Sequence, residues 1–209
     1  MTDFVTYTGN RENQINWSDV FRDLKERGIK GVKLVVSDFQ TGLVNAVERE
    51  FQGCEWQRCQ FHLMKNIRDK VKPKMRSELV SDIQTVFNSS NKELAYEYLE
   101  RIINKYQDSY PDLADYLEAN VPDALTVFNF PDKHRKRLRT TNTIERLNQE
   151  LKRRTQVIRI FPNEKSLIRL VSTLCMDISE EWVTGKRYLD MNLEEIKIEE
   201  DKKRLSVVS

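Results

Sequence analysis

Apolar side chains recur with the period of an α-helix almost without a break between residues 63 and 124. Pro73, Pro111 and Pro122 fall between the repeats, where proline is tolerated. The chain of 209 residues holds only 6 glycines and 5 prolines, and this composition also favours helices. We therefore predict a series of helices in the middle of the chain. The repeats are Leu63/Ile67, Leu79/Ile83/Val86/Phe87, Leu94/Tyr98/Ile102 and Leu113/Tyr116/Leu117.

The residues before this region predict a strand–helix–strand unit behind an opening helix. Apolar residues with helical spacing, from Trp17 to Leu24, predict a helix between Asn16 and Gly28. A short β-branched run over residues 32–36 leads into Ser37-Asp38 and predicts a buried strand with a carboxylate at its end. A helix is expected over residues 43–50 and a second strand over residues 55–61. The expected fold class is therefore α/β.

Composition narrows the class of protein. Three cysteines, Cys54, Cys59 and Cys175, are too few and odd in number for a disulfide scaffold, which predicts a reducing cytoplasm. No apolar run approaches the roughly 18 residues of a membrane span, and the first residues lack the pattern of a signal peptide. We expect a soluble protein in the cytoplasm that does not contact a membrane.

Two carboxylates stand where metal ligands can be presented. Asp38 ends the first predicted strand, and Glu145 lies at the start of a predicted helix. Two-metal phosphoryl transfer needs several carboxylates that converge on ions about 3.5–4 Å apart. Each acid also has a structural explanation: Asp38 as a turn or cap residue, and Glu145 as the partner of Asn142 in a capping arrangement.

Five blocks of sequence resemble the Mutator/IS256-like family of bacterial DDE transposases. They are WSDVFRDLKER at residues 17–27, GVKLVVSD at 31–38 with Gly42-Leu43, WQRCQFH at 56–62, TTNTIERLNQELKRRTQVIRIFPNEKS at 140–166, and a block from Glu180 to Leu189. Together they cover about residues 12–191. The resemblance implies an RNase H-like catalytic core that nicks the ends of a mobile element and joins the freed 3′-OH to target DNA. It also implies Mg²⁺ or Mn²⁺ as cofactor.

The resemblance assigns two members of the catalytic triad to this chain. Asp38 would be the second acid and Glu145 the third, and the apolar side of the Glu145 helix, with Ile144, Leu147 and Leu151, would pack on the sheet. The family's first Asp would lie on an earlier strand, upstream of residue 17. We therefore expect a chain that lacks this acid and the N-terminal DNA-binding region, and that is inactive alone. The alternative function is a catalytically dead product that binds only DNA or intact transposase subunits.

Cys59 and His62 form a Cys-x-x-His pair between the two acids. The resemblance places such a motif near the active site, where it has a structural role or helps to position DNA. A buried cysteine beneath a hydrogen-bonded histidine explains the pair equally well. A zinc site would need Cys54 and His134 as further ligands, and the missing second close pair disfavours it.

The net charge of +2 hides a strongly basic segment. Between Lys133 and Arg159 there are ten basic residues and two acidic ones. A solvated helix face would explain such a run, but basic residues around a phosphoryl-transfer centre are also what DNA requires. We expect the following side chains to contact DNA, at element ends and target: Arg135, Lys136, Arg137, Arg139, Arg146, Lys152, Arg153 and Arg154.

These expectations divide the chain into four parts. Residues 1–62 would form a partial RNase H-like core that lacks its first strand, and residues 63–132 a helical insertion. Residues 133–191 would complete the core with the Glu145 helix and a helical C-terminus, and residues 192–209 would form a charged tail. Trp17 and Trp182 are expected as core anchors. By resemblance we also expect a homo-oligomer.

Overall fold

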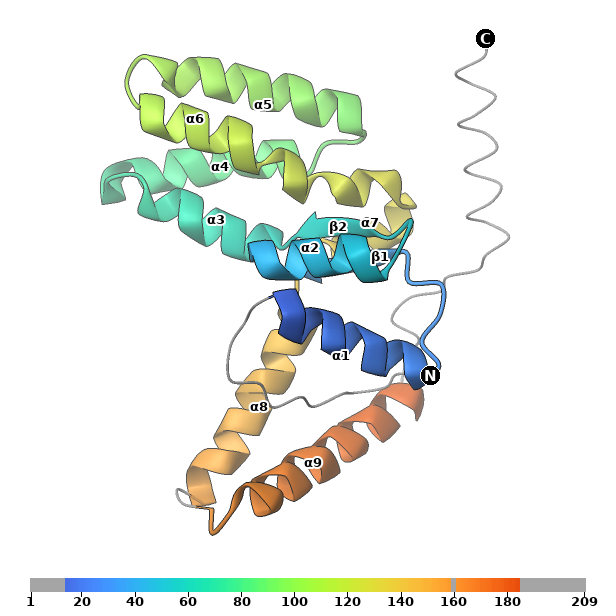
Figure 1. Ribbon diagram of the computed structural model, residues 1–209. Helices are drawn as coiled ribbons and strands as arrows, with labels where there is room; N and C mark the ends of the chain where they lie inside the picture. Colours follow the sequence, from blue (N-terminus) through green and yellow to red (C-terminus); the bar gives the residue numbers. More distant parts are fainter. Residues whose placement is uncertain (1–13, 159–160, 185–209) are drawn as a thin grey trace.

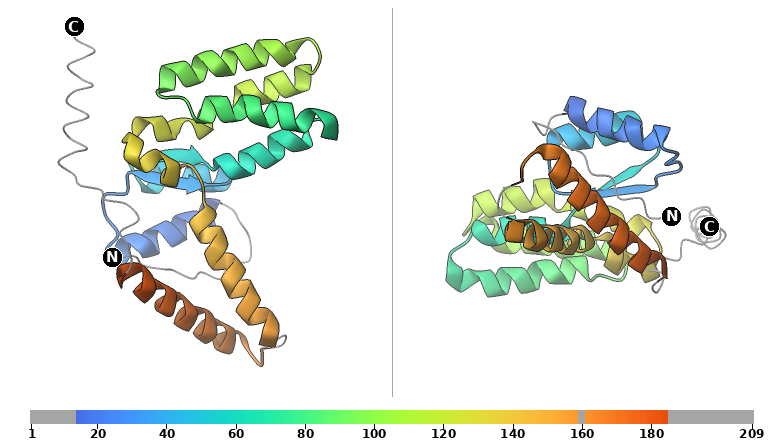
Figure 2. Two further views of the ribbon diagram at one scale, coloured as in Figure 1. Left: turned by 180° about the vertical axis from the view of Figure 1, so that it is seen from behind. Right: turned by 90° about the horizontal axis from the view of Figure 1, so that it is seen from below.

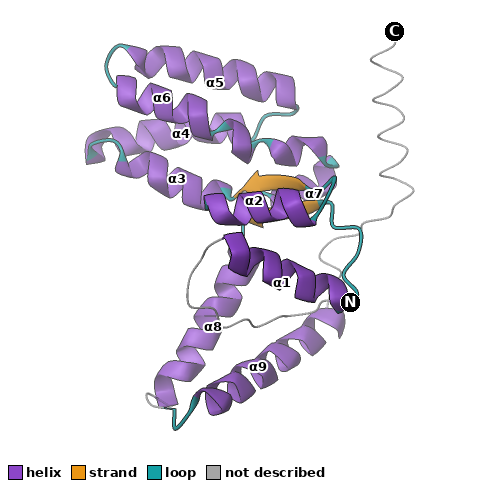
Figure 3. Cartoon of the chain, viewed as in Figure 1, coloured by secondary structure: helices purple, strands orange, loops and turns teal. Residues whose placement is uncertain are grey.

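A strand–helix–strand unit forms the centre of the fold. The computed structural model describes residues 14–158 and 161–184, and this part of the chain is mostly helical (Figures 1 and 3). Strands β1 (Leu34–Ser37) and β2 (Glu55–Arg58) pair in parallel, with Leu34 opposite Glu55 and Ser37 opposite Arg58. Because the strands are parallel, both carboxyl ends lie at the same edge of the sheet.

Two helices pack together beside this sheet. Helix α1 (Gln14–Glu26) lies against α2 (Thr41–Glu50), the helix that connects the strands. Phe21, Leu43, Ala46 and Val47 form their buried core. Trp17 packs against this cluster, as expected, and its indole N–H donates to Oε1 of Gln40 over 2.6 Å. The predicted helix and strand order of this region is confirmed.

A second, larger core lies within the predicted helical region. Helices α3 (Gln60–Asp69), α4 (Arg76–Phe87), α5 (Lys92–Gln107) and α6 (Pro111–Asn120) pack around fully buried Leu63, Ile67, Leu79, Ile83 and Leu117. Three short 3₁₀ turns complete it: η1 (Pro73–Met75), η2 (Pro122–Ala124) and η3 (Thr126–Asn129). Pro73, Pro111 and Pro122 each open an element, as the sequence predicts.

The amide of Gln57 joins the helical region to the sheet. This side chain on β2 is fully buried; its Nε2 donates to the carbonyl of Ala124 over 2.8 Å, and its Oε1 accepts from the N–H of Val127 over 2.7 Å. Gln60 donates a further 2.8 Å hydrogen bond to the same carbonyl of Ala124. Buried amides of this kind are costly unless paired, so these bonds fix the helices to the second strand.

The last described helices form a V-shaped arm. After the short α7 (Asp132–Leu138), α8 (Asn142–Ile158) runs away from α5 and α6, and α9 (Glu164–Thr184) folds back (Figures 1 and 2). The expectation that Ile144 packs on the sheet is wrong, because its side chain is 49% exposed. The Glu145 side chain, 30% exposed, bonds to Thr141 instead, and Leu147, three residues after Ile144, is buried. None of the described helices is long and apolar enough to cross a membrane.

Three expectations lie outside the described residues. The charged tail at residues 192–209 is one of them, as is the end of the resemblance from residue 185 to residue 191. The side chain of Trp182 is the third. The second predicted strand, by contrast, is shorter than expected, because Cys59 ends the extended backbone and α3 begins at Gln60.

Candidate active site

Asp38 lies one residue beyond β1, at the carboxyl edge of the sheet. Its side chain is 57% exposed. The preceding residue, Ser37, is fixed in place: its hydroxyl accepts a 2.9 Å hydrogen bond from the indole N–H of Trp56 and donates to the carbonyl of Asp38 over 2.8 Å. The strand end therefore holds this carboxylate at the surface with its backbone restrained.

His62 lies between the two predicted acids. It is in the first turn of α3, where its Nδ1 contacts Oδ1 of Asp38 and its Nε2 lies 3.5 Å from Oε1 of Glu145. The imidazole and the Glu145 side chain are each 30% exposed. Phe61 packs against the imidazole with a ring-centroid distance of 5.3 Å. One imidazole thus joins carboxylates from two distant parts of the chain.

Glu145 is held at the start of α8 by Thr141. The hydroxyl of Thr141 donates a 3.0 Å hydrogen bond to Oε1 of Glu145, and the Glu145 N–H donates to the Thr141 carbonyl over 3.0 Å. Asn142 is the first residue of α8, so Thr141, and not Asn142, is the residue before the helix. Sequence reasoning missed Thr141. The available signal was a threonine four residues before the acid, since its hydroxyl can donate to a carboxylate one helical turn further on.

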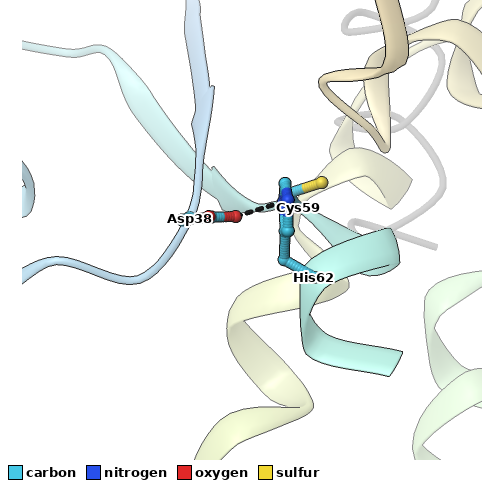
Figure 4. Close-up of side chains that lie close together, drawn as sticks. All are labelled: Asp38, Cys59 and His62. Carbon is cyan, nitrogen blue, oxygen red and sulfur yellow. Dashed lines mark ion pairs between the residues drawn. The ribbon is translucent and has the colours of Figure 1, made fainter. Parts of the chain in front are cut away.

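Cys59 contacts both halves of this site. Its side chain is fully buried, and its Sγ lies 3.4 Å from Oγ1 of Thr141 and accepts the Thr141 N–H over 3.4 Å. Its own N–H donates to the carbonyl of Ser37 over 2.8 Å. Ligand-type atoms of Asp38, Cys59 and His62 lie within 4.8 Å of one another (Figure 4).

The four-ligand zinc set is not assembled. Among the described residues, the one cluster of metal-ligand side chains that gathers around Cys59 and His62 includes neither Cys54 nor His134. Cys54 instead donates to the carbonyl of Glu55, and His134 is buried in α7. The second close ligand pair that a structural zinc site needs is therefore absent from this cluster.

Two of the predicted DNA-contacting arginines are bonded to the protein itself. The guanidinium of Arg135 donates to the carbonyls of Phe130, Ser90 and Phe128 over 2.9–3.2 Å, and it pairs with Asp132. Nη1 of Arg139 donates to the Phe87 carbonyl over 3.1 Å and to Oδ1 of Asn88 over 3.0 Å. Burial lowers the pKa of the Arg139 guanidinium. Both residues fasten α7 to the helical region.

The other predicted DNA contacts lie at the surface. Arg153 and Arg154 are 67% and 51% exposed, and both pair with Glu150 one turn earlier on α8. Hydrogen bonds from Arg153 and Arg154 lower the pKa of Glu150 to about 2. Four more of the predicted basic residues are exposed on α7 and α8: Lys136, Arg137, Arg146 and Lys152.

Comparison with known proteins identifies the family of this chain. Residues 5–185 match the family model described as "Transposase, Mutator family". The chain is 41% identical over 182 residues to the transposase for insertion sequence element IS406 of Burkholderia multivorans, covering 87% of this chain and 47% of that protein. It is 37% identical over 182 residues to the ISRM5 transposase of Rhizobium meliloti, with 87% and 46% coverage.

A third relative extends the likeness to a staphylococcal element. The chain is 36% identical over 184 residues to the transposase for IS256 in transposon Tn4001 of Staphylococcus aureus, again covering 87% of this chain and 47% of the relative. The chain spans about half the length of the curated relatives that it matches. The match to the family model covers most of the chain and includes Asp38, the Cys59–His62 pair and Glu145. This chain therefore belongs to the Mutator family of transposases.

Proposed function

We propose that this chain contributes two metal ligands, Asp38 and Glu145, to the RNase H-like catalytic core of an insertion-element transposase. Such a DDE enzyme cleaves DNA at element ends and transfers the strand to a target. The observation that carries the proposal is the meeting of the two carboxylates at one imidazole, at the carboxyl edge of a parallel sheet. The family membership supplies the reaction class.

The donor set fits a divalent cation. Carboxylate oxygens are the ligands that Mg²⁺ and Mn²⁺ prefer. Mg²⁺ binds its oxygen ligands at about 2.0–2.1 Å, so the His62 ring must shift before one ion can touch both acids. When bound, the ions would stabilise charge on the attacking and leaving oxygens of the phosphoryl transfer.

Thr141 would prepare Glu145 for this role, while His62 would hold the two carboxylates only until an ion displaces its ring. In the metal-free chain the two imidazole nitrogens contact Asp38 and Glu145, and the Thr141 hydroxyl bonds to Glu145 independently of that ring. Ligand carboxylates that are already oriented lose less conformational freedom on binding an ion. The chain itself would therefore orient the Glu145 carboxylate.

The exposed basic side chains of α7 and α8 would bind the DNA backbone. Arg146 follows Glu145 directly, and Lys152, Arg153 and Arg154 lie further along the same helix. Phosphate contacts of this kind position the duplex without reading its sequence. Arg135 and Arg139 are less suited to the role, because carbonyl oxygens of the protein already occupy their donors.

The same proposal includes a homo-oligomer that acts on two element ends in the cytoplasm. Large apolar side chains on the arm support an association between copies: Val157 on α8 is 79% exposed and Met176 on α9 is 65% exposed. Apolar residues at such positions are typical of protein interfaces when they gather on one surface.

A DNA-binding titration tests the proposal. Fluorescence anisotropy with a duplex at several salt concentrations gives the number of phosphate contacts, since each contributes about 0.9 to the slope of log K against log[salt]. Replacing both Arg153 and Arg154 with alanine should reduce that slope by about 2. Arg101→Ala, at a 69% exposed arginine on α5, is the matched control and should leave the slope unchanged.

Cleavage assays test the expectation that this chain is inactive alone. Nicking of supercoiled or element-end DNA by the chain that requires Mn²⁺ and is lost in Asp38→Asn would contradict that expectation and show a catalytic role for Asp38. DNA binding without nicking, with Mn²⁺ affinity unchanged in Asp38→Asn and Glu145→Gln, would favour the alternative of a protein that only binds DNA or transposase subunits. An unchanged salt slope in the Arg153/Arg154 double variant would refute the assignment of the DNA surface.

A further inference from the structure

We infer that the buried thiol of Cys59 is a positioning group that holds Thr141 and, through it, sets the Glu145 carboxylate opposite Asp38. The inference rests on the proposed function, because it concerns the placement of a proposed metal ligand. Its basis is a short chain of contacts: Cys59 Sγ to Thr141 at 3.4 Å, and the Thr141 hydroxyl to Glu145 Oε1 at 3.0 Å.

The Cys59 thiol contacts the backbone N–H of Thr141 as well as its hydroxyl. The Thr141 N–H donates to Sγ, and this N–H immediately precedes the first residue of α8. The next residue after Cys59 adds a parallel bond, because the Gln60 N–H donates to the Arg139 carbonyl over 2.9 Å. The segment that leads into α8 is thus tied at two points to the start of α3.

Cys59 is also bonded to the residue that precedes the other acid, Asp38. Its N–H donates to the carbonyl of Ser37 over 2.8 Å, and Ser37 is the residue before Asp38. A single residue therefore bonds to the strand that ends at one proposed ligand and to the segment that begins the helix of the other. A change in the Cys59 side chain should move Glu145 relative to Asp38 while leaving the Ser37 bond intact.

The fully buried position argues against a role for this thiol at the reacting atoms. Sγ accepts a hydrogen bond from Thr141, and the side chain has no exposed surface. A free buried cysteine usually behaves as a small apolar residue with weak hydrogen-bonding capacity. Here the Cys59 thiol bonds to one threonine. The two residues of the Cys-x-x-His pair therefore have different roles: Cys59 orients Glu145 through Thr141, and His62 contacts both carboxylates.

Amide hydrogen exchange tests the contact without any metal. In Cys59→Ala, exchange at the Thr141 amide, followed by NMR, should become at least about 10-fold faster, since its acceptor is gone. In Cys59→Ser the protection should be largely restored. Cys175→Ala is the control, because Cys175 is also buried but lies on α9. Equal Thr141 protection in wild type and Cys59→Ala would overturn the inference.

Metal affinity tests the consequence for the site. Mn²⁺ binding measured by electron paramagnetic resonance should weaken about 10–100-fold in Cys59→Ala and Thr141→Val, as is usual when partners of metal ligands are removed. Cys175→Ala should bind Mn²⁺ as wild type does, even where it lowers the melting temperature. Thr141→Ser, which keeps the hydroxyl, should recover most of the affinity that Thr141→Val loses. Thr141→Val keeps the test valid if Cys59→Ala does not fold.

The outcomes separate this inference from the proposed function. If Asp38→Asn and Glu145→Gln weaken Mn²⁺ binding but Cys59→Ala and Thr141→Val do not, the positioning role is refuted and the proposed function stands. If Asp38→Asn and Glu145→Gln leave Mn²⁺ affinity unchanged, the proposed metal site is itself refuted, and the positioning role toward it falls too.

Discussion

Replacing Arg139 with alanine should destabilise the fold rather than weaken DNA binding. Its Nη1 bonds two acceptors, the carbonyl of Phe87 at 3.1 Å and Oδ1 of Asn88 at 3.0 Å. Phe87 is the last residue of α4, where a cation also interacts favourably with the helix dipole. The side chain is half-buried, and burial lowers its pKa, which indicates that it is partly withdrawn from water.

The size of the effect follows from these two bonds. Hydrogen bonds from a charged group contribute about 1.5–3 kcal/mol each, but partial exposure reduces this and both acceptors can turn to water. We expect Arg139→Ala to cost about 2–3 kcal/mol. With a urea slope of about 2 kcal/mol/M, the unfolding midpoint should fall by roughly 1–1.5 M.

Urea unfolding followed by circular dichroism measures this shift. DNA-binding anisotropy on the same samples tests the alternative, in which Arg139 contacts a DNA phosphate. Lys136→Ala, at an exposed lysine on α7, is the control and should change stability by less than about 0.5 kcal/mol. A stable Arg139→Ala variant with a reduced DNA salt slope would refute this reasoning and restore Arg139 as a phosphate contact.

Three further predictions concern the helical region and the free thiols. Asn91→Ala should cost about 1 kcal/mol in urea unfolding, because the Asn91 side chain caps α5 by accepting the Leu94 N–H over 2.8 Å; a loss below about 0.3 kcal/mol would contradict this. Tyr106 is buried and donates to Asp82, which raises the pKa of its phenol to about 12. Since the phenol has a lower pKa of about 10 in the unfolded chain, this contribution to stability is complete below pH 10 and declines as the pH rises toward 12. Ultraviolet titration should show one tyrosine that ionises at higher pH than the others, and Tyr106→Phe should remove that step. Burial raises the pKa of the Cys54 thiol, so a thiol reagent at pH 8 should modify it more slowly than a free cysteine, and an equal rate would contradict its placement.

The sequence predicted the elements well where the apolar period was strong. The helices around Leu63 and Leu117 bury apolar residues that recur with the helical period, so their type was encoded locally. A proline opens α6, so the start of that helix was encoded locally as well. The strand before Asp38 was equally clear, because a β-branched run has few alternatives. The end of β2 was not, since the turn at Cys59 depends on its bond to Ser37 in the neighbouring strand.

The candidate site was predicted in its residue types but not in its connections. Asp38, Glu145 and the Cys-x-x-His pair were singled out by motif, yet the threonine that links Cys59 to Glu145 was not. The contact of Thr141 with Glu145 is local, whereas the contact of Cys59 with Thr141 joins residues far apart in sequence, and no local pattern records it. The bonds of Arg139 were not predictable either, because their acceptors lie at the end of another helix. A run of basic residues does not indicate which of its side chains bond within the protein and which are available to DNA.

The most direct measurement of the central claim is a crystal structure of the chain with Mn²⁺, using the anomalous signal of the ion. We predict a peak bound by Asp38 and Glu145 at the carboxyl edge of the sheet, with the His62 ring shifted from its place between them. Asp115→Asn, at an exposed acid on α6, should keep that peak, whereas Asp38→Asn should remove it. A peak that contacts neither carboxylate, or one that persists in Asp38→Asn, would contradict the account.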